Sequence, residues 1–378
     1  ATAPPHPFCV SPRDSYVTRR PNLLDPHRCF GITFGSPFVR PGRKCRKDQE
    51  MKPKILVTRE VFDETIEYLN SHFEVQANQS DRIFNREDLI AKLQGLDGVQ
   101  TASSDRIDAE LVSKCASLRA ICNTAVGYNN IDVEACTRAG IQVTNTPGVL
   151  TQSVADYAMG LIIATCRRMT EGETYLRNGE WKSVYLKQML GRDVHGATLG
   201  IFGFGRIGQA IARRARGFDM KVFYHSRNRA AGDAEEACGA TYAGKEDLLR
   251  KADIVLLILP LTKETQHYIG AREIALMKPT AVLVNVARGG IVDDAALIAA
   301  LRKKTIWAAG LDVYENEPAL NPGFLELRNV VLSPHIASAS EPTRKAMAMT
   351  AAKNLVAALA GQAPPNLLNP DYRKFRSQ

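Results

Sequence analysis

The segment Gly200-Ile-Phe-Gly-Phe-Gly-Arg-Ile-Gly-Gln209 constrains the fold of this chain more than any other part of the sequence. It follows an apolar run, Thr198–Phe202, and leads into a helical pattern, Gln209–Arg216. A strand, a G-x-G-x-x-G turn and a helix in this order are typical of dinucleotide-binding folds, where the glycines allow a tight turn and close approach of the pyrophosphate. The N–H groups at the start of the helix favour the negative charge of the phosphates. We therefore predict that the pyrophosphate of a dinucleotide is bound by Gly203, Gly205, Arg206, Ile207 and Gly208.

Short β-branched runs alternate with helical patterns along the rest of the chain. Such alternation predicts an α/β fold with parallel strands covered by helices on both faces. The first series of strands is expected at Ile55–Thr58, Gly98–Ala102, Leu118–Asn123 and Ile141–Asn145. A second series of six is expected at Thr198–Gly203, Lys221–Tyr224, Ile254–Leu259, Ala281–Val286, Ala309–Val313 and Val330–Leu332. Six strands are the number that a full dinucleotide-binding sheet uses.

The glycine turn lies more than halfway along the 378 residues, so a separate folded unit is expected before it. A long apolar helix, Ser153–Met169, separates the two strand series, and an Ala-rich helix, Thr343–Leu359, follows the second. Ser340 and Pro342 provide start signals for that last helix. We expect it to return to the first unit.

Residues 1–50 have a different composition from the remainder. They contain nine Lys or Arg against four acids, and eight of the nineteen prolines. No strand or helix periodicity is present, and this composition buries little apolar surface. We interpret residues 1–50 as a disordered extension and Met51 as the natural start of the folded chain; a targeting segment or a nucleic-acid-binding arm are the alternatives.

The overall composition excludes several classes of protein. The net charge of +9 is mostly carried by residues 1–50, and the hydrophobic content of 45% is that of an ordinary globular protein. The longest apolar run, Ala158–Cys166, is too short to span a bilayer. The eight cysteines show no paired spacing typical of metal sites, so we expect reduced thiols in a cytoplasmic protein and no bound metal. We also expect that neither a membrane nor a nucleic acid is a partner.

The end of the strand after the glycine turn indicates which nicotinamide cofactor fits. An acid about twenty residues past the turn would hydrogen-bond the ribose 2′-hydroxyl of NADH and repel a 2′-phosphate. This strand instead ends in Ser226-Arg227-Asn228-Arg229. Because Ser226 can donate a hydrogen bond and the guanidinium groups of Arg227 and Arg229 can bind a phosphate, we predict NADPH, with NADH as the poorer cofactor.

Three polar residues follow later strands at their carboxyl ends, where α/β sheets bind ligands. They are Arg288 in NVARGG, Glu317 in DVYENEP and His335 in LSPHIAS. His335, supported by Glu317, can protonate the oxygen of a carbonyl group, and Arg288 can bind an adjacent carboxylate. This division of labour predicts reduction of a 2-oxo acid.

The motifs GFGRIG, LILPLTKET, NVARGGIVDDAALIAAL, AAGLDVYENEP and LSPHIAS resemble those of the D-isomer-specific 2-hydroxyacid dehydrogenases, over Met51 to Asn369. Within that family, GRDVHGATLGIFGFGRIG and the Ser226-Arg227 strand end are most similar to bacterial NADPH-dependent glyoxylate/hydroxypyruvate reductases that also reduce 2-ketogluconate. The resemblance implies a Rossmann-type doubly wound parallel sheet inserted into a flavodoxin-like α/β substrate domain. Residues 51–152 and 338–378 would form the substrate-binding domain, and residues 153–337 the dinucleotide-binding domain.

The resemblance also implies roles for individual residues. Arg288 and His335 would contact the substrate, together with backbone N–H groups around Val126 and Gly127 in NTAVGYNNID. Further cofactor contacts are implied at Thr151, Leu259, Pro260, Thr265, Val286, Ala287 and Asp312. The helix after Thr151 would also serve a homodimer. Asn129 departs from the family, which commonly has Asp at this position; asparagine keeps the turn-forming side chain and loses the charge.

Two alternatives to the NADPH-dependent reductase are left by the sequence. One is an NAD-linked dehydrogenase of the same family with another substrate, which the absence of an acid after Lys221–His225 argues against. The other is a catalytically weak NAD(H)-sensing corepressor, because the same fold supports both functions.

Overall fold

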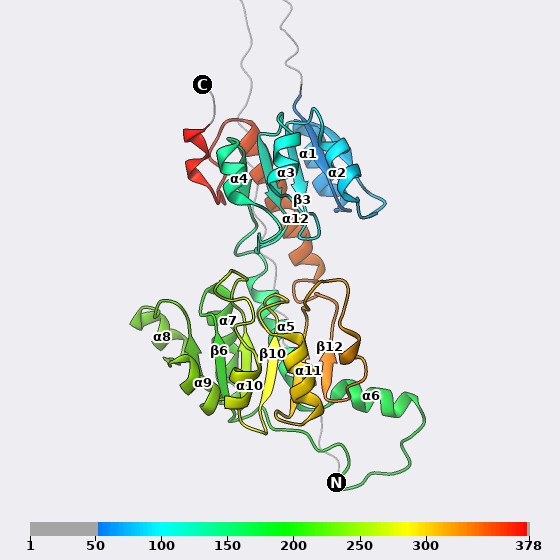
Figure 1. The fold of residues 1–378 in the computed structure, drawn as a ribbon, viewed down its shortest axis with the longest axis vertical. Coiled ribbons are helices and arrows are strands. Elements are labelled where there is room, and N and C mark those ends of the chain that lie inside the picture. The colour runs from blue at the N-terminus through cyan, green and yellow to red at the C-terminus, as the bar shows by residue number, and fades with distance from the viewer. Residues whose placement is uncertain (1–51, 376–378) are drawn as a thin grey trace, which may run out of the picture. The chain divides into compact units, whose positions relative to one another are not determined.

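The computed structural model describes residues 52–375, which contain two parallel β-sheets (Figure 1). The first sheet has five strands in the order β2-β1-β3-β4-β5, and all of its pairs are parallel. The strands are β1 (Lys54–Val57), β2 (Glu74–Ala77), β3 (Gly98–Thr101), β4 (Ala120–Asn123) and β5 (Gln142–Thr144). This order is the flavodoxin-like one, as predicted.

Helices α1 (Asp63–His72), α2 (Arg86–Leu93), α3 (Ala109–Lys114) and α4 (Val133–Arg138) connect these strands. Three of them begin at a side-chain cap, in which Asn85, Asp108 and Asp132 accept a hydrogen bond from the N–H three residues later. Such caps satisfy N–H groups that have no partner within the helix. Strand β2 was not predicted, because none of its four residues is buried and its sequence shows no apolar run.

The second sheet has seven strands in the order β12-β11-β10-β9-β6-β7-β8. They are β6 (Thr198–Phe202), β7 (Lys221–His225), β8 (Ala240–Tyr242), β9 (Ile254–Leu257), β10 (Val282–Asn285), β11 (Ala308–Leu311) and β12 (Val330–Leu332). The prediction of six strands is therefore wrong by one. The additional strand, β8, has three residues at the edge of the sheet and only Ala240 is buried, so it leaves no periodic signal. The strand order reverses between β6 and β9, which is where doubly wound sheets bind their ligands.

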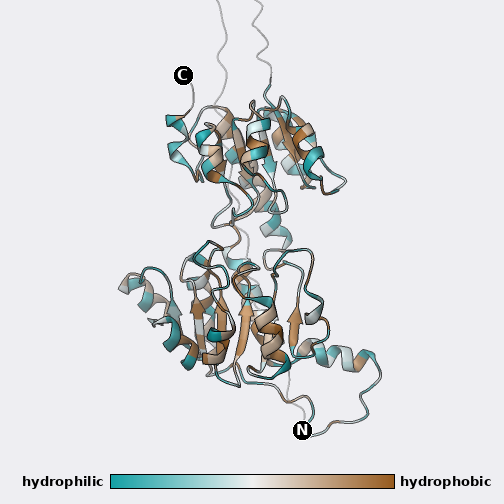
Figure 2. Cartoon of the chain, viewed as in Figure 1, coloured by the Kyte–Doolittle hydropathy of each residue, from teal (hydrophilic) through white to brown (hydrophobic). Residues whose placement is uncertain are grey.

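Helices α7 (Arg206–Ala215), α8 (Gly232–Cys238), α9 (Lys245–Lys251), α10 (Ala271–Leu276) and α11 (Asp294–Arg302) cover the second sheet. Apolar clusters lie on both of its faces, one including Ile201 and Val284 and the other including Val255 and Leu283. Figure 2 shows the strands of the second sheet as mainly hydrophobic. The central strands are apolar along their length because helices bury both of their faces.

The long helix between the sheets is α5 (Thr151–Cys166), and a second helix, α6 (Met169–Arg177), follows it. The predicted helix Ser153–Met169 was therefore placed too late at both ends. It ends before Met169 because Arg168 adopts a left-handed conformation with φ of 52°. Helix α5 packs on the second sheet through Ala155, Ala158 and Ile162.

The last long helix, α12 (Glu341–Leu359), packs on the first sheet. Ala351, Ala352 and Leu355 of α12 lie in one cluster with Ile55 and Ala120. The Gln100 amide in β3 also donates to the Ala348 carbonyl at 3.2 Å. This packing supports the proposal that residues 51–152 and 338–378 form one domain around the inserted residues 153–337.

The cysteines of the described residues lie in the core, as reduced thiols. The described cysteines, Cys115, Cys122, Cys136, Cys166 and Cys238, are all buried and free. Burial raises the pKa of Cys122, Cys136 and Cys166 to about 12, so these thiols stay protonated. The predictions made for residues 1–50, including Cys9, Cys29 and Cys45, lie outside the described residues.

Candidate active site

The glycine turn joins β6 to α7. Gly203 has a φ of 100°, and a Cβ at this position would lie 2.6 Å from the Ile258 carbonyl oxygen. At Gly208 a Cβ would lie 2.2 Å from the Gly203 carbonyl oxygen, whereas nothing lies within 4 Å of a Cβ at Gly205. No side chain caps the N-terminus of α7. The turn therefore offers free N–H groups and open space beside Gly205, which fits a dinucleotide pyrophosphate.

The strand end after β7 places its three candidate residues differently. Arg227 lines a pocket of about 1060 Å³ that also contains His335 and Arg288. The Ser226 hydroxyl instead donates to the Asn228 carbonyl at 2.6 Å. Arg229 lies outside the pocket lining and donates to both carboxylate oxygens of Glu235, at 2.9 and 2.8 Å. The hydrogen bonds of Arg229 and Tyr224 lower the pKa of Glu235 to about 2. Arg229 could bind a 2′-phosphate only by leaving this pair, which changes the expectation drawn from the sequence.

The segment after β9 forms another part of the pocket wall. Leu259 and Pro260 line the pocket, but Thr265 does not. Instead the Thr265 hydroxyl donates to the Pro260 carbonyl at 2.7 Å and accepts from the Thr262 N–H at 2.7 Å. Thr265 therefore supports the turn that carries the lining residues. Thr151, the first residue of α5, is buried beside lining residues Leu150 and Val154 and lies outside the lining itself.

His335 and Glu317 form a hydrogen-bonded pair beyond the carboxyl ends of β12 and β11. His335 Nδ1 lies 2.8 Å from Glu317 Oε2, and the Tyr314 N–H donates to Glu317 Oε1 at 2.8 Å. Burial of the Glu317 carboxyl opposes its ionisation, but the bond from His335 and the Tyr314 N–H outweigh this and hold its pKa below the ordinary value. Because Nδ1 is engaged, Nε2 is the nitrogen of His335 that is available to a ligand.

Asp312 shapes the loop that carries His335. Its buried carboxylate accepts hydrogen bonds from the Ser333 hydroxyl and from the N–H groups of Ile336 and Ala337, each at 2.9 Å. His335 itself has a positive φ of 54°, an unfavourable conformation for a residue with a Cβ, and its N–H donates to the Asp312 carbonyl at 2.9 Å. The sequence reasoning gave Asp312 a cofactor contact and missed this support of the His335 loop.

Arg288 follows Val286 and Ala287, which also line the pocket. Its Nη1 donates to the Ala287 carbonyl at 2.7 Å, and its Nε donates to Asn129 Oδ1 at 3.3 Å. Burial holds the pKa of Arg288 below its ordinary value, and the charge of Glu317 offsets only part of this effect. The guanidinium still stays charged, because arginine is not deprotonated in proteins. No ion pair of Arg288 with a carboxylate is found within residues 52–375. Its charge is therefore available to an anionic ligand.

Val126 and Gly127 follow β4 on the opposite wall. Their carbonyls accept hydrogen bonds from the side-chain amides of Asn145 and Asn123, at 2.8 and 2.9 Å. Their own N–H groups donate to no backbone or side-chain acceptor in the described part of the chain. Two free N–H groups beside a guanidinium are suited to binding a carboxylate.

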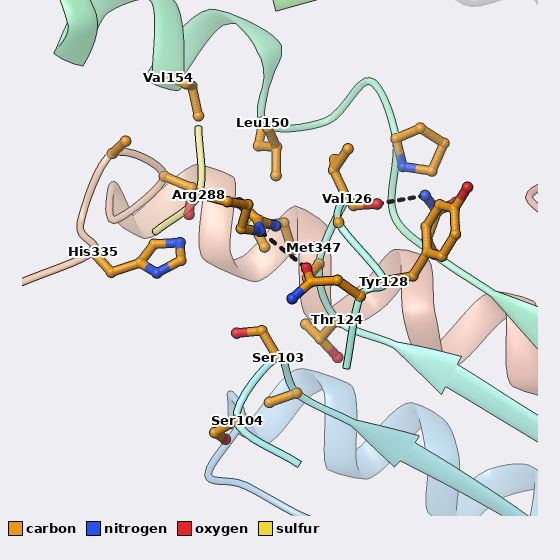
Figure 3. A pocket seen from close by; sticks show the side chains of 18 of the residues that line it. Ser103, Ser104, Thr124, Val126, Tyr128, Leu150, Val154, Arg288, His335 and Met347 are labelled. Carbon is orange, nitrogen blue, oxygen red and sulfur yellow. Dashed lines mark hydrogen bonds between the residues drawn. The ribbon is translucent and has the colours of Figure 1, made fainter. Parts of the chain in front are cut away.

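Residues of both sheets line one pocket of about 1060 Å³, shown in part in Figure 3. It brings together Val126, Gly127, Arg206, Ile207, Arg227, Leu259, Pro260, Val286, Ala287, Arg288, Asp312 and His335. Sequence reasoning missed the lining residues Arg59, Ser103, Ser104, Thr124, Arg344 and Met347. Four of these follow the carboxyl ends of β1, β3 and β4, a position that would have indicated them. Residues 52–375 contain no group of three or more His, Cys, Asp and Glu that could hold a metal ion.

A glycine turn for a dinucleotide and a His–Glu pair beside a free guanidinium define a dinucleotide-dependent oxidoreductase site. Residues 159–337 match the family model for the D-isomer specific 2-hydroxyacid dehydrogenase NAD-binding domain. The chain is 49% identical to a glyoxylate reductase of Thermococcus kodakarensis over 330 residues, covering 86% of this chain and 99% of the relative. A glyoxylate reductase of Pyrococcus furiosus is 48% identical over 330 residues, covering 86% and 98%. The chain therefore belongs to the D-isomer-specific 2-hydroxyacid dehydrogenase family.

Solved structures agree with this assignment. One similar structure is an NADPH-dependent glyoxylate/hydroxypyruvate reductase from Sinorhizobium meliloti in complex with NADP and malonate, with a TM-score of 0.75 and 34% identity. It is matched over 86% of this chain and 99% of its own. A glyoxylate reductase from Paecilomyes thermophila has a TM-score of 0.77 and 34% identity, over 84% and 98% of the two chains. The protein is thus an enzyme with a nicotinamide cofactor that converts a 2-oxo acid to a hydroxy acid.

Along the described residues, no helix combines the length and the apolar character that crossing a membrane requires.

Proposed function

We propose that this protein reduces small 2-oxo acids to D-2-hydroxy acids with NADPH, and that glyoxylate, hydroxypyruvate and 2-ketogluconate are among its substrates. The observation that carries the proposal is that one pocket is lined by His335, whose ring is hydrogen-bonded to Glu317, by the uncompensated guanidinium of Arg288, and by Arg206 and Ile207 of the glycine turn. Each of these supplies a different requirement of carbonyl reduction.

The substrate carboxylate would be bound by Arg288 and by the free N–H groups of Val126 and Gly127. This contact orients the adjacent keto group, and the guanidinium stabilises the negative charge that develops on its oxygen. His335, as an imidazolium, would donate a proton from Nε2 to that oxygen. Glu317 holds the ring in place through Nδ1. The bound nicotinamide supplies the hydride when it is reduced.

The cofactor would lie along the glycine turn, with its pyrophosphate at the N-terminus of α7. Its further contacts would come from Leu259, Pro260, Val286, Ala287 and Asp312. Two features support NADPH over NADH: no acid follows β7, and Arg227 lines the pocket. Arg227 would bind the 2′-phosphate, joined by Ser226 once its hydroxyl leaves the Asn228 carbonyl, whereas Arg229 serves the fold through Glu235 unless that pair opens.

We propose a homodimer in which the segment after α5 contributes to the interface. Large apolar side chains are exposed along this segment, and clustered exposure of this kind is typical of interaction surfaces. They are Met169, Leu176, Trp181, Val184, Tyr185, Leu186 and Leu190. We also propose a cytoplasmic location, since the described cysteines are free and buried.

A kinetic panel tests the proposed function. The full chain is assayed for NADPH and NADH oxidation with glyoxylate, hydroxypyruvate, 2-ketogluconate and pyruvate, and the configuration at C2 is determined for every product except glycolate, which has no stereocentre. We expect D-products and a higher kcat/KM with NADPH than with NADH. An L-product, or binding of NAD(H) without appreciable turnover of any 2-oxo acid, would contradict the proposal, and the second result would favour the corepressor.

A further inference from the structure

The turn after β3 presents two serines to the pocket. Ser103 and Ser104 both line it, on the wall formed by the first sheet. Figure 3 shows Ser103 between this wall and the side chains of Arg288 and His335, while Leu150 and Val154 lie on the other side of Arg288. The turn therefore presents polar side chains to the space beside Arg288 and His335, where the substituent of a bound 2-oxo acid would lie.

Buried hydrogen bonds hold the turn in place. The carboxylate of Asp105, whose residue is 4% exposed, accepts from the hydroxyls of Thr58 and Thr101 at 2.5 and 2.8 Å and from the Ala102 N–H at 2.9 Å. The Asn130 side chain donates to the carbonyls of Ala102 and Asp105 at 3.1 and 3.0 Å. Because buried charge-assisted bonds of this kind are strong, the backbone on either side of the serines is fixed.

The two serines differ in how their hydroxyls are used. The Ser104 hydroxyl accepts from Arg59 Nη1 at 3.0 Å, and Arg59 is itself held by both carboxylate oxygens of Asp81, at 2.7 and 3.0 Å. The Ser103 hydroxyl makes no hydrogen bond to another residue in the range 52–375 and is exposed to the pocket. Ser103 therefore offers one free donor and acceptor on a fixed backbone.

We propose that Ser103 determines substrate specificity by hydrogen-bonding a hydroxyl group on the carbon next to the keto group of the 2-oxo acid. The inference rests on the proposed function. With the carboxylate on Arg288 and the N–H groups of Val126 and Gly127, and the keto oxygen at His335, the third substituent faces the turn after β3. A substrate with a hydroxyl at that carbon gains a bond that pyruvate, with a methyl group there, cannot make.

The size of the effect follows from the energy of one neutral hydrogen bond between enzyme and substrate. Loss of such a bond corresponds to roughly a three- to tenfold change in kcat/KM. The change should fall on the hydroxylated substrate alone, because Ser103 has no contact with the carboxylate or the keto group in the proposed arrangement.

The test compares hydroxypyruvate with pyruvate in the full chain and its variants. Ser103→Ala is expected to lower the ratio of kcat/KM for hydroxypyruvate over pyruvate by roughly three- to tenfold, and Ser103→Thr, which keeps the hydroxyl, to restore most of it. Ser104→Ala is the matched control, because the Ser104 hydroxyl is already bonded to Arg59. In this variant the ratio of kcat/KM for hydroxypyruvate over pyruvate should stay within about twofold of wild type. Equal NADPH affinity of all variants, measured by fluorescence, verifies that they are folded.

An unchanged ratio in Ser103→Ala, or an equal loss with both substrates, would overturn the inference while leaving the proposed function standing. A wild-type chain that reduces neither substrate would instead remove the proposed function, and the inference with it. The two failures are therefore distinguished by the wild-type measurement alone.

Discussion

Gly127 and Arg288 follow strands of different sheets and touch so closely that a Cβ at Gly127 would force the end of the Arg288 side chain to move. A Cβ built on Gly127 would lie 2.0 Å from Nη2 of Arg288 and 2.7 Å from its Cζ. The guanidinium thus lies against the backbone that carries the free N–H groups of Val126 and Gly127. The proposed carboxylate site depends on this close approach of two loops.

Gly127→Ala is expected to displace Arg288 and to raise the KM for 2-oxo acids by roughly ten- to a hundredfold, since a shift of about 1 Å in a positioning group can have such an effect. NADPH affinity should be unchanged. Steady-state kinetics and fluorescence titration measure the two quantities. Gly217→Ala is the control, because nothing lies within 4 Å of a Cβ there. Normal kinetics in Gly127→Ala would contradict the proposal that substrate binding depends on this close approach of Gly127 and Arg288.

His335→Gln is expected to reduce kcat by roughly 10²- to 10⁴-fold, the usual contribution of a general acid. Glutamine keeps a hydrogen bond to Glu317 within reach but cannot supply the proton. NADPH binding should persist, because the glycine turn is separate from His335. Stopped-flow and titration measurements test both points, and substantial turnover in the variant would assign the proton donor elsewhere.

Arg227→Ala is expected to raise the KM for NADPH by roughly tenfold or more, with little effect on NADH, because a charged hydrogen bond to the 2′-phosphate is lost. Arg229→Ala serves as the comparison, since Arg229 is paired with Glu235 at 2.8 Å. It should change NADPH selectivity less than Arg227→Ala does. A larger effect of Arg229→Ala would show that the Glu235 pair opens when the cofactor binds.

The predictable parts of this protein are those in which one local pattern fixes one local structure. The turn at Gly203 was predictable because Gly203 and Gly208 leave no space for a Cβ and Gly205 leaves open space for a ligand. Arg288, Glu317 and His335 were predictable because they follow mainly apolar strands. Strands β2 and β8 were not predictable, because they lie at sheet edges and bury few residues.

The remaining differences arise from contacts between distant segments. The pairing of Arg229 with Glu235 spans a turn and a helix, so the sequence alone could not separate it from the role of Arg227. The Asp312 carboxylate is engaged by the loop after β12, more than twenty residues later. Ser103 was missed because a lone serine in a turn carries no pattern, and its position becomes evident only once Asp105 and Asn130 fix the turn.

The proposed dimer can be tested at the exposed segment after α5. Leu186 is 95% exposed and Val184 is 82% exposed. Because a charge buried in an apolar interface is costly, Leu186→Glu is expected to shift the chain from dimer to monomer in sedimentation velocity. Leu325→Glu, at a leucine that is 68% exposed elsewhere, should leave the assembly unchanged. A wild-type monomer would contradict the proposal directly.

Asp294, at the start of α11, predicts a pH dependence of stability. The residue is 4% exposed, and its carboxyl accepts a hydrogen bond from the Glu315 N–H at 3.1 Å. Burial, with the nearby charges of Glu315 and Asp293, raises its pKa from 3.8 to about 6, against the N–H bond and the charge of His267. The folded state therefore binds this proton more tightly than the unfolded state, so the stabilisation is complete below pH 3.8 and is lost as the pH rises through about 6.

Asp294→Asn removes this dependence while its side-chain oxygen can still accept from Glu315. The difference in free energy of unfolding between the variant and wild type should change in favour of the variant by on the order of 2 kcal/mol as the pH rises from about 4 to about 8. This size follows from the pKa shift. Urea denaturation at several pH values measures the difference. Asp132→Asn is the matched control, because Asp132 caps α4 through the Ala135 N–H at 2.8 Å and asparagine caps equally well. Parallel stability curves for wild type and Asp294→Asn would mean that the Asp294 carboxyl is ionised at no cost in the folded protein.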